Sequence, residues 1–254
     1  MIKRIFIGLT ILLNCFNGVQ GQELKKEYQD LVTDFIDCVK SSKIERIADK
    51  ISYPFEREYP IPTIKNKQEF SHRFNEIIDD SLKQIIINSN PSTDWSAVGW
   101  RGIMLNQGIL WIDYDGKLRG VNYQSKTEKE LKDRLIKEDK ANIHSSLSNF
   151  TRPVYLLETT EFRIRIDEIN KDNYRYASWT INKSMNDKPD LIIENGKLEF
   201  QGSGGNHNIR FKNSDSIYEC SIIVMGSKDM PPAMFKIYNG DKEVLSQTAT
   251  IIKE

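Results

Sequence analysis

The segment 95–123, WSAVGWRGIMLNQGILWIDYDGKLRGVNY, decides the fold of the first half of the chain. It holds three of the four tryptophans and predicts three strands, at 98–105, 109–114 and 118–123. Two short turns, Asn106-Gln107-Gly108 and Asp115-Gly116-Lys117, separate the strands, because Gly, Asn and Asp tolerate the positive φ of tight hairpins. We expect a three-stranded antiparallel meander whose aromatic surface is covered by the helices that precede it.

Helical periodicity marks the chain before this meander. Apolar residues recur at three- and four-residue steps over 23–40, and a short helix is predicted over 43–50. A third helix begins at Asn66 and carries apolar residues at helical spacing as far as Leu82. Between the second and third helices, prolines at 54, 60 and 62 predict an extended segment. The β-branched run 85–87 favours a strand.

The order helix, short helix, proline-rich segment, helix and meander resembles a known family. Residues 24–123 are similar to the NTF2-like (cystatin-like α+β) domains of exported proteins from Bacteroidetes-type bacteria. The resemblance is carried by Ile51-Ser-Tyr-Pro-Phe55, Asn66-Lys-Gln-Glu-Phe70, Val98-Gly-Trp-Arg-Gly-Ile103 and Gly108-Ile-Leu-Trp-Ile-Asp113 with Asp115-Gly-Lys117. It implies a cone-shaped pocket between sheet and helices. It does not assign a function, because this fold hosts enzymes, binding domains and adaptors.

The sequence pattern of the second half of the chain predicts a charged helix followed by an all-β domain. A capping box, Thr127-Glu-Lys-Glu130, predicts a charged helix that runs to about residue 140, and the linker that follows is rich in Ser and Asn. Nine short β-type runs then extend from 154 to 251, with Asn195-Gly196 and Asn239-Gly240 as predicted hairpin turns. This spacing predicts a β-sandwich or small barrel. We therefore expect four segments along the chain. They are a signal peptide at 1–21, the NTF2-like domain at 22–125, a charged helix and linker at 126–152, and the β domain at 153–254.

Three motifs carry a second resemblance, to β domains of exported Bacteroidetes-type proteins with no established activity. They are Tyr174-Arg-Tyr-Ala-Ser-Trp179, Asp187-Lys-Pro-Asp190 and Gly202-Ser-Gly-Gly-Asn-His207.

The N-terminus has the order of a secretory signal peptide. Lys3 and Arg4 precede an apolar run too short to span a bilayer, and Val19-Gln20-Gly21 offers small residues for cleavage before Gln22. We therefore expect a periplasmic or secreted protein. An alternative is a lipoprotein, because Leu12-Leu13-Asn14-Cys15 is similar to a lipobox, although Asn14 departs from that pattern. Beyond residue 23 no run is long and apolar enough for a transmembrane helix.

The charge balance and the cysteines limit which partners, metal sites and disulfides the chain can have. Both Lys+Arg and Asp+Glu number 36, and removing residues 1–21 leaves 34 basic against 36 acidic side chains. This near-neutral balance argues against nucleic acid as a partner. We expect Cys38 and Cys220 to be buried thiols, with a disulfide between the halves as the alternative. The sequence predicts neither a metal site nor a cofactor, because it contains no CxxC pair or His/Cys cluster.

Candidate ligand-binding residues fall into two groups. In the meander, Trp100, Arg101, Trp111 and Asp113 are predicted on adjacent strands, where an Asp in an apolar cone would suit a general base. The alternative is an exposed, paired Asp113 at the end of a strand. His72, on the third predicted helix, is expected at the surface.

The second group lies in the glycine-rich loop 202–207. Gly204 and Gly205 can expose backbone N–H groups that bind an anion, and Asn206 and His207 would then contact a ligand or a partner. The alternative is a loop that lets two strands meet closely. The loop lacks the Lys and the following helix of a nucleotide-binding P-loop.

No catalytic set is apparent, so we expect a non-catalytic binding module for an unknown protein or small molecule. One alternative is an NTF2-like hydrolase or isomerase that acts in the N-terminal cone. The other is an inhibitor or immunity-type protein that uses the loop 202–207.

Overall fold

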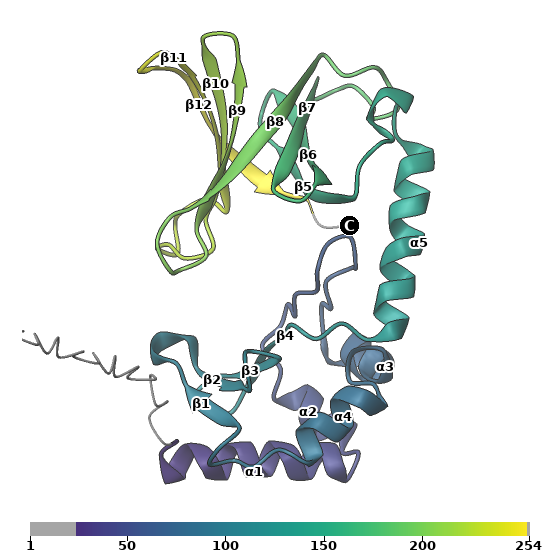
Figure 1. The fold of residues 1–254 in the computed structure, drawn as a ribbon, viewed down its shortest axis with the longest axis vertical. Coiled ribbons are helices and arrows are strands. Elements are labelled where there is room, and N and C mark those ends of the chain that lie inside the picture. Colours follow the sequence, from purple (N-terminus) through teal and green to yellow (C-terminus); the bar gives the residue numbers. More distant parts are fainter. Residues whose placement is uncertain (1–23, 253–254) are drawn as a thin grey trace, which may run out of the picture.

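The computed structural model describes residues 24–252 and shows two parts joined by one long helix (Figure 1). The first part is α+β, with helices packed on a four-stranded antiparallel sheet, and the second is a closed eight-stranded antiparallel barrel. The predicted fold class is confirmed, and the barrel is the correct one of the two β architectures expected. The predicted signal peptide 1–21 and Cys15 lie outside the described residues.

Four helices form the outer layer of the first part: α1 (Lys26–Lys40), α2 (Ile44–Asp49), α3 (Lys67–Ile77) and α4 (Asp80–Ile87). Asn66 caps α3 as expected, because its side chain accepts a hydrogen bond from the Glu69 N–H at 2.9 Å. The predicted third helix is wrong in its extent: α3 ends at Ile77, and Asp79 caps a new helix. The run 85–87 belongs to α4 and is not a strand. The helix that begins at Asp80 therefore continues through three isoleucines despite their β propensity.

The sheet consists of β1 (Trp95–Ala97), β2 (Ile103–Leu105), β3 (Leu110–Ile112) and β4 (Leu118–Val121), paired in that order. Both predicted turns are confirmed. The predicted first strand, 98–105, is interrupted by a 3₁₀ turn, Gly99–Arg101. Gly102 follows this turn at φ +97°, and a Cβ there would lie 2.5 Å from the Ile112 carbonyl oxygen. The chain therefore turns where the alternation alone predicts a continuous strand.

One face of this sheet forms the core of the first part. Alternate strand residues on it are buried against apolar side chains of the helices: Ile103, Leu105, Leu110, Ile112, Val32, Phe35, Phe70 and Phe74. Trp111 alternates with Leu110 and Ile112, so its side chain lies on the opposite face. The buried face is the one that the NTF2-like resemblance associates with a pocket, and here it is packed with Phe and Ile side chains.

The linking helix is α5 (Lys126–Asn142), which is followed by a 3₁₀ turn, Ser145–Leu147. Its capping residue is Ser125, whose Oγ accepts from the Glu128 N–H at 3.1 Å. The helix is therefore capped at Ser125, two residues before Thr127, the capping residue that the sequence predicts. Ser125 is fully buried, and its hydroxyl remains satisfied there because it also donates to the Glu76 carbonyl of α3.

The barrel is built from β5 (Arg152–Glu158), β6 (Phe162–Asn170), β7 (Asn173–Thr180), β8 (Leu191–Phe200), β9 (His207–Asn213), β10 (Ser216–Ile222), β11 (Ala233–Asn239) and β12 (Lys242–Ile251). Neighbours in sequence pair along the barrel, and β12 closes it on β5 through Thr250 and Ile251. Tyr176, Phe211, Cys220 and Phe235 fill the interior. Cys38 and Cys220 are both buried and unpaired, as expected.

The Asn195-Gly196 pair is not a hairpin turn, contrary to the prediction. Both residues lie inside β8, and its register with β7 shifts between Tyr174 and Tyr176. Asn195 has φ 64°. At Gly196 a Cβ would lie 2.1 Å from the ring of Phe211, which is fully buried. Gly196 is therefore required for close packing in the barrel rather than for a turn. Asn239-Gly240 does form the predicted turn.

Replacing Gly196 with alanine is expected to destabilise the barrel by about 1–3 kcal/mol, the range for inserting atoms into a packed core. The reason is that Phe211 has no open space into which its ring can move. Urea denaturation followed by circular dichroism measures the loss. Gly120→Ala is the matched control, since nothing lies within 4 Å of a Cβ at that strand position. Equal midpoints for the two variants would contradict this account of Gly196.

Candidate functional site

Five of the eight candidate residues line one small pocket. Its volume is about 290 Å³, and it is bordered by residues of both parts of the chain. The α+β part contributes Trp100, Arg101, Trp111, Arg119 and Gly120, and the barrel contributes Ser203, Gly204 and Gly205. We call this the smaller pocket. The two motifs lie about a hundred residues apart in the sequence, and the fold brings them together.

Trp100 and Arg101 reach the smaller pocket from the 3₁₀ turn and not from a strand, which corrects the prediction. Trp100 is 49% exposed, and the guanidinium carbons of Arg101 and Arg119 lie 5.9 and 6.0 Å from its ring centroid. These are cation–π distances. Trp111 lies on β3 opposite Gly120, which has no side chain to cover the indole. The wall of this pocket thus combines aromatic surface with positive charge.

Asp113 lies outside the residues that line this pocket. Its carboxylate accepts a hydrogen bond from Arg119 at 3.2 Å, and its side chain is 35% exposed. It alternates with Ile112, so it lies away from the buried core between helices and sheet. His72 is exposed on α3, as expected. The structure therefore places Asp113 in a surface ion pair rather than in an apolar cone.

Asn206 and His207 hold the barrel loops together. The Asn206 side chain accepts from the backbone N–H groups of Val224 and Met225 at 2.9 and 2.7 Å, and it donates to the Met225 carbonyl. His207 is 7% exposed, and its Nδ1 lies 2.8 Å from the Gly205 carbonyl. Since a carbonyl only accepts, Nδ1 carries the hydrogen. Both side chains position the loop 202–207.

The other ring nitrogen of His207 faces Tyr155. Its Nε2 lies 3.0 Å from the Tyr155 hydroxyl, which donates to it when the imidazole is neutral. Burial raises the pKa of Tyr155 above its usual value, so the phenol keeps its proton. This pair lies at one edge of a second, larger pocket.

The larger pocket has a volume of about 700 Å³ and lies at one end of the barrel. One wall is the proline-rich segment 56–63, which rises from the first part toward the barrel (Figure 1). The other wall is mostly apolar and comes from the strand ends of β5, β8, β10 and β12: Val154, Leu156, Leu198, Phe200, Ile222, Ile223, Val224, Ile251 and Ile252. Phe200 and Val224 are 70% and 63% exposed.

The segment 56–63 is held in place by buried charge. Arg57 donates to both carboxylate oxygens of Glu128 on α5, and also to the carbonyls of Val121 and Tyr123. The side chains of Arg57 and Glu128 are 4% and 0% exposed. Glu58 pairs with Lys132 of α5 at 2.6 Å. These contacts fix the wall of the larger pocket to the linking helix.

Three of the charged side chains that line the larger pocket form ion pairs. Arg57 pairs with Glu128, Glu58 with Lys132, and Arg152 with Glu168 at 2.5 Å. The remaining lining is largely aliphatic, so this cavity suits an uncharged, apolar group. Sequence reasoning missed it. The available signals were the apolar runs 222–225 and 251–252, which continue beyond the ends of the strands.

Within residues 24–252, no three His, Cys, Asp or Glu residues lie close enough together to hold a metal ion. Over the same range, none of the helices has the length and hydropathy to cross a membrane. No protein-family model matches the sequence, and no curated protein or solved structure matches it.

Proposed function

We propose that this chain is an exported, non-catalytic binding protein that holds a small apolar molecule in the larger pocket. The observation that carries the proposal is the position of that pocket between two parts of the chain, with aliphatic walls and paired charges. Mouths of β-barrels are frequent ligand sites, and about 700 Å³ lies within the usual range for small molecules.

The exposed apolar residues at the barrel end also support a binding role. Phe200, Val224, Met225 and Met230 are each at least 44% exposed. Phe200 and Val224 line the larger pocket, and Met225 lies beside Gly204 of the smaller one. Burying such surface stabilises a complex by about 25 cal/mol per Å² of apolar area. A ligand that covers these side chains thus gains affinity from surface that the protein leaves in water.

We infer an NTF2-like α+β part from the order of helices and meander. A periplasmic or secreted location rests on residues 1–21, and a lipoprotein attached through Cys15 is the alternative.

Two other functions have less support. A hydrolase or isomerase in the N-terminal cone would need Asp113 beside a second polar group in a cavity, but Asp113 pairs with Arg119 at the surface. An inhibitor would need the loop 202–207 to offer Asn206 and His207 to a partner, but both are engaged within the barrel.

The test fills the larger pocket from its barrel wall. Ile223→Trp adds bulk at a half-buried lining position, so it is expected to weaken binding of the uncharged probe N-phenyl-1-naphthylamine at least ten-fold. Probe fluorescence measures the affinity. Val244→Trp is the control, because Val244 is 54% exposed on β12 and does not line this pocket.

Two results would contradict the proposal. One is that the unmodified protein leaves the probe unbound at millimolar protein concentration. The other is that Ile223→Trp and Val244→Trp bind it equally well.

A further inference from the structure

The smaller pocket presents positive charge that the described part of the chain does not neutralise. Arg101 is exposed and has no ion-pair partner among residues 24–252, and its guanidinium group lies over the ring of Trp100. Arg119 lies over the same ring and shares its charge with Asp113 at 3.2 Å. The indole of Trp100 therefore makes cation–π contacts with two guanidinium groups at the edge of the pocket. The ring restricts their positions, while the N–H groups that do not contact Asp113 remain free to donate in the guanidinium plane.

The opposite wall supplies backbone donors. Ser203, Gly204 and Gly205 line the pocket, and their N–H groups have no hydrogen-bond acceptor within the described residues. The hydrogen bonds of Asn206 to Val224 and Met225 hold this loop in shape. Gly205 has φ +88°, a backbone conformation that turns successive amides away from a regular ladder. Successive free amides in such a loop form an anion-binding concavity.

We propose that the smaller pocket binds an oxyanion, a carboxylate, sulfate or phosphate, carried on a single ring. Arg101 and Arg119 donate to the anionic group from one side, and the amides of the glycine loop donate from the other. The ring lies against the aromatic wall formed by Trp100 and Trp111. Gly120 leaves room for it, because a Cβ at this position would meet nothing within 4 Å. This site differs from the larger pocket in its residues and in the charge of its ligand.

Size and charge together select this ligand class. A volume of about 290 Å³ is at the lower end for small-molecule sites and admits one ring with its substituent. A free inorganic anion would use the arginines but leave the aromatic wall in water. A neutral ring would use that wall but leave the donors unpaired. The proposal therefore requires that both features act together.

The test compares a ring, an anion and their combination by isothermal titration calorimetry with the purified protein. Phenyl phosphate and glucuronate represent an aromatic and a sugar source of the ring. Phenol and glucose are their neutral counterparts, and inorganic phosphate is the anion alone. At least one of the two anionic ring compounds is expected to bind ten-fold or more tightly than its neutral counterpart and than phosphate. Which of the two binds identifies the source.

Arg101→Gln assigns the binding to this pocket. It is expected to weaken the preferred compound about ten-fold, while Arg134→Gln removes an equal charge from the exposed face of α5 and leaves the affinity unchanged. Circular dichroism checks that both variants are folded. Three results would overturn the proposal: no binding of either anionic ring compound, equal affinity for the neutral counterpart, or equal affinity of the two variants. None of these bears on the larger pocket, which is tested with an uncharged probe.

Discussion

Glu128→Gln is expected to destabilise the protein by about 3 kcal/mol or more. The carboxylate of Glu128 is fully buried and receives two hydrogen bonds from Arg57, which is itself 4% exposed. A neutral amide of the same shape leaves the guanidinium buried without its counter-charge. Breaking one partner of a buried pair typically costs about 3–5 kcal/mol. The loss is measured as a lower midpoint in urea.

The control for this variant is Glu130→Gln on the same helix. Glu130 is 65% exposed and lies 3.8 Å from Lys126, so its removal is expected to change the stability by less than about 1 kcal/mol. If the two variants unfold at the same urea concentration, the buried pair does not hold the segment 56–63 to α5. The wall of the larger pocket would then need another explanation.

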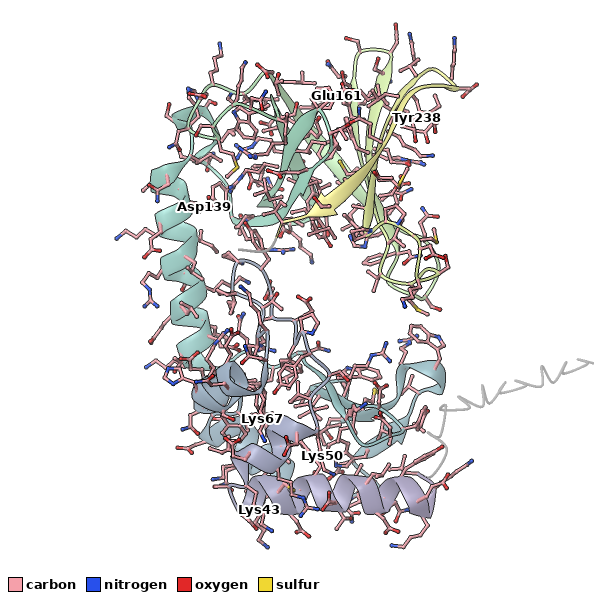
Figure 2. All side chains as sticks on the ribbon, turned by 180° about the vertical axis from the view of Figure 1, so that it is seen from behind. Lys43, Lys50, Lys67, Asp139, Glu161 and Tyr238 are labelled. Carbon is pink, nitrogen blue, oxygen red and sulfur yellow. The ribbon has the colours of Figure 1, made fainter. Side chains whose placement is uncertain are left out.

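Asp167→Asn is the second substitution with a large expected effect, about 3–5 kcal/mol. The side chain of Asp167 is 1% exposed and lies between two buried arginines, Arg165 at 2.8 Å and Arg175 at 2.7 Å. Arg165 also donates to Asp139 near the barrel end of α5 (Figure 2). The substitution therefore leaves two guanidinium groups with one carboxylate at the junction of helix and barrel.

The charges in this cluster depend strongly on one another. Burial alone lowers the pKa of Arg165, but its hydrogen bonds to Asp139 and the negative charge of Asp167 outweigh burial and raise that pKa above its usual value. Asp133→Asn, on the exposed face of α5, is the matched control and is expected to be nearly neutral. Urea midpoints that agree for the two variants would show that the cluster does not stabilise the barrel.

The elements that the sequence predicts correctly are those with local causes. The turns at Asn106–Gly108 and Asp115–Lys117 form because Gly and Asn residues there adopt positive φ. The stripe on α1 is buried because its spacing matches the helical repeat. The alternation at 162–167 places Ile164 and Ile166 in the barrel interior. Each of these signals is contained within a few residues, so no knowledge of distant contacts is needed.

The predictions that fail depend on distant neighbours. Asn195-Gly196 is a common hairpin pair, but its glycine is required by the ring of Phe211 on another strand. Arg165 and Asp167 alternate with the inward-facing Ile164 and Ile166, yet both are buried, and Arg165 pairs with Asp139 of α5. Local alternation cannot show which outer residues a later packing step buries.

The candidate site also combines features that are local in the sequence with contacts between distant residues. The sequence singled out Trp100, Arg101 and the glycine loop by their residue types, and the fold places them around one pocket. It gave no indication that the two groups meet, because the contact joins parts separated by about a hundred residues. The larger pocket was missed for the same reason, since Arg57 and Glu128 that fix its wall are 71 residues apart.

In the proposed function, both parts of the chain together form the binding site at the barrel mouth. Hydrogen exchange measured by mass spectrometry, with and without saturating N-phenyl-1-naphthylamine, tests it most directly. We expect slower exchange in the segment 56–63 of the α+β part and in the segment 222–232 of the barrel, with little change in α1. Slower exchange in only one of these segments, or in neither, would contradict a site shared by the two parts.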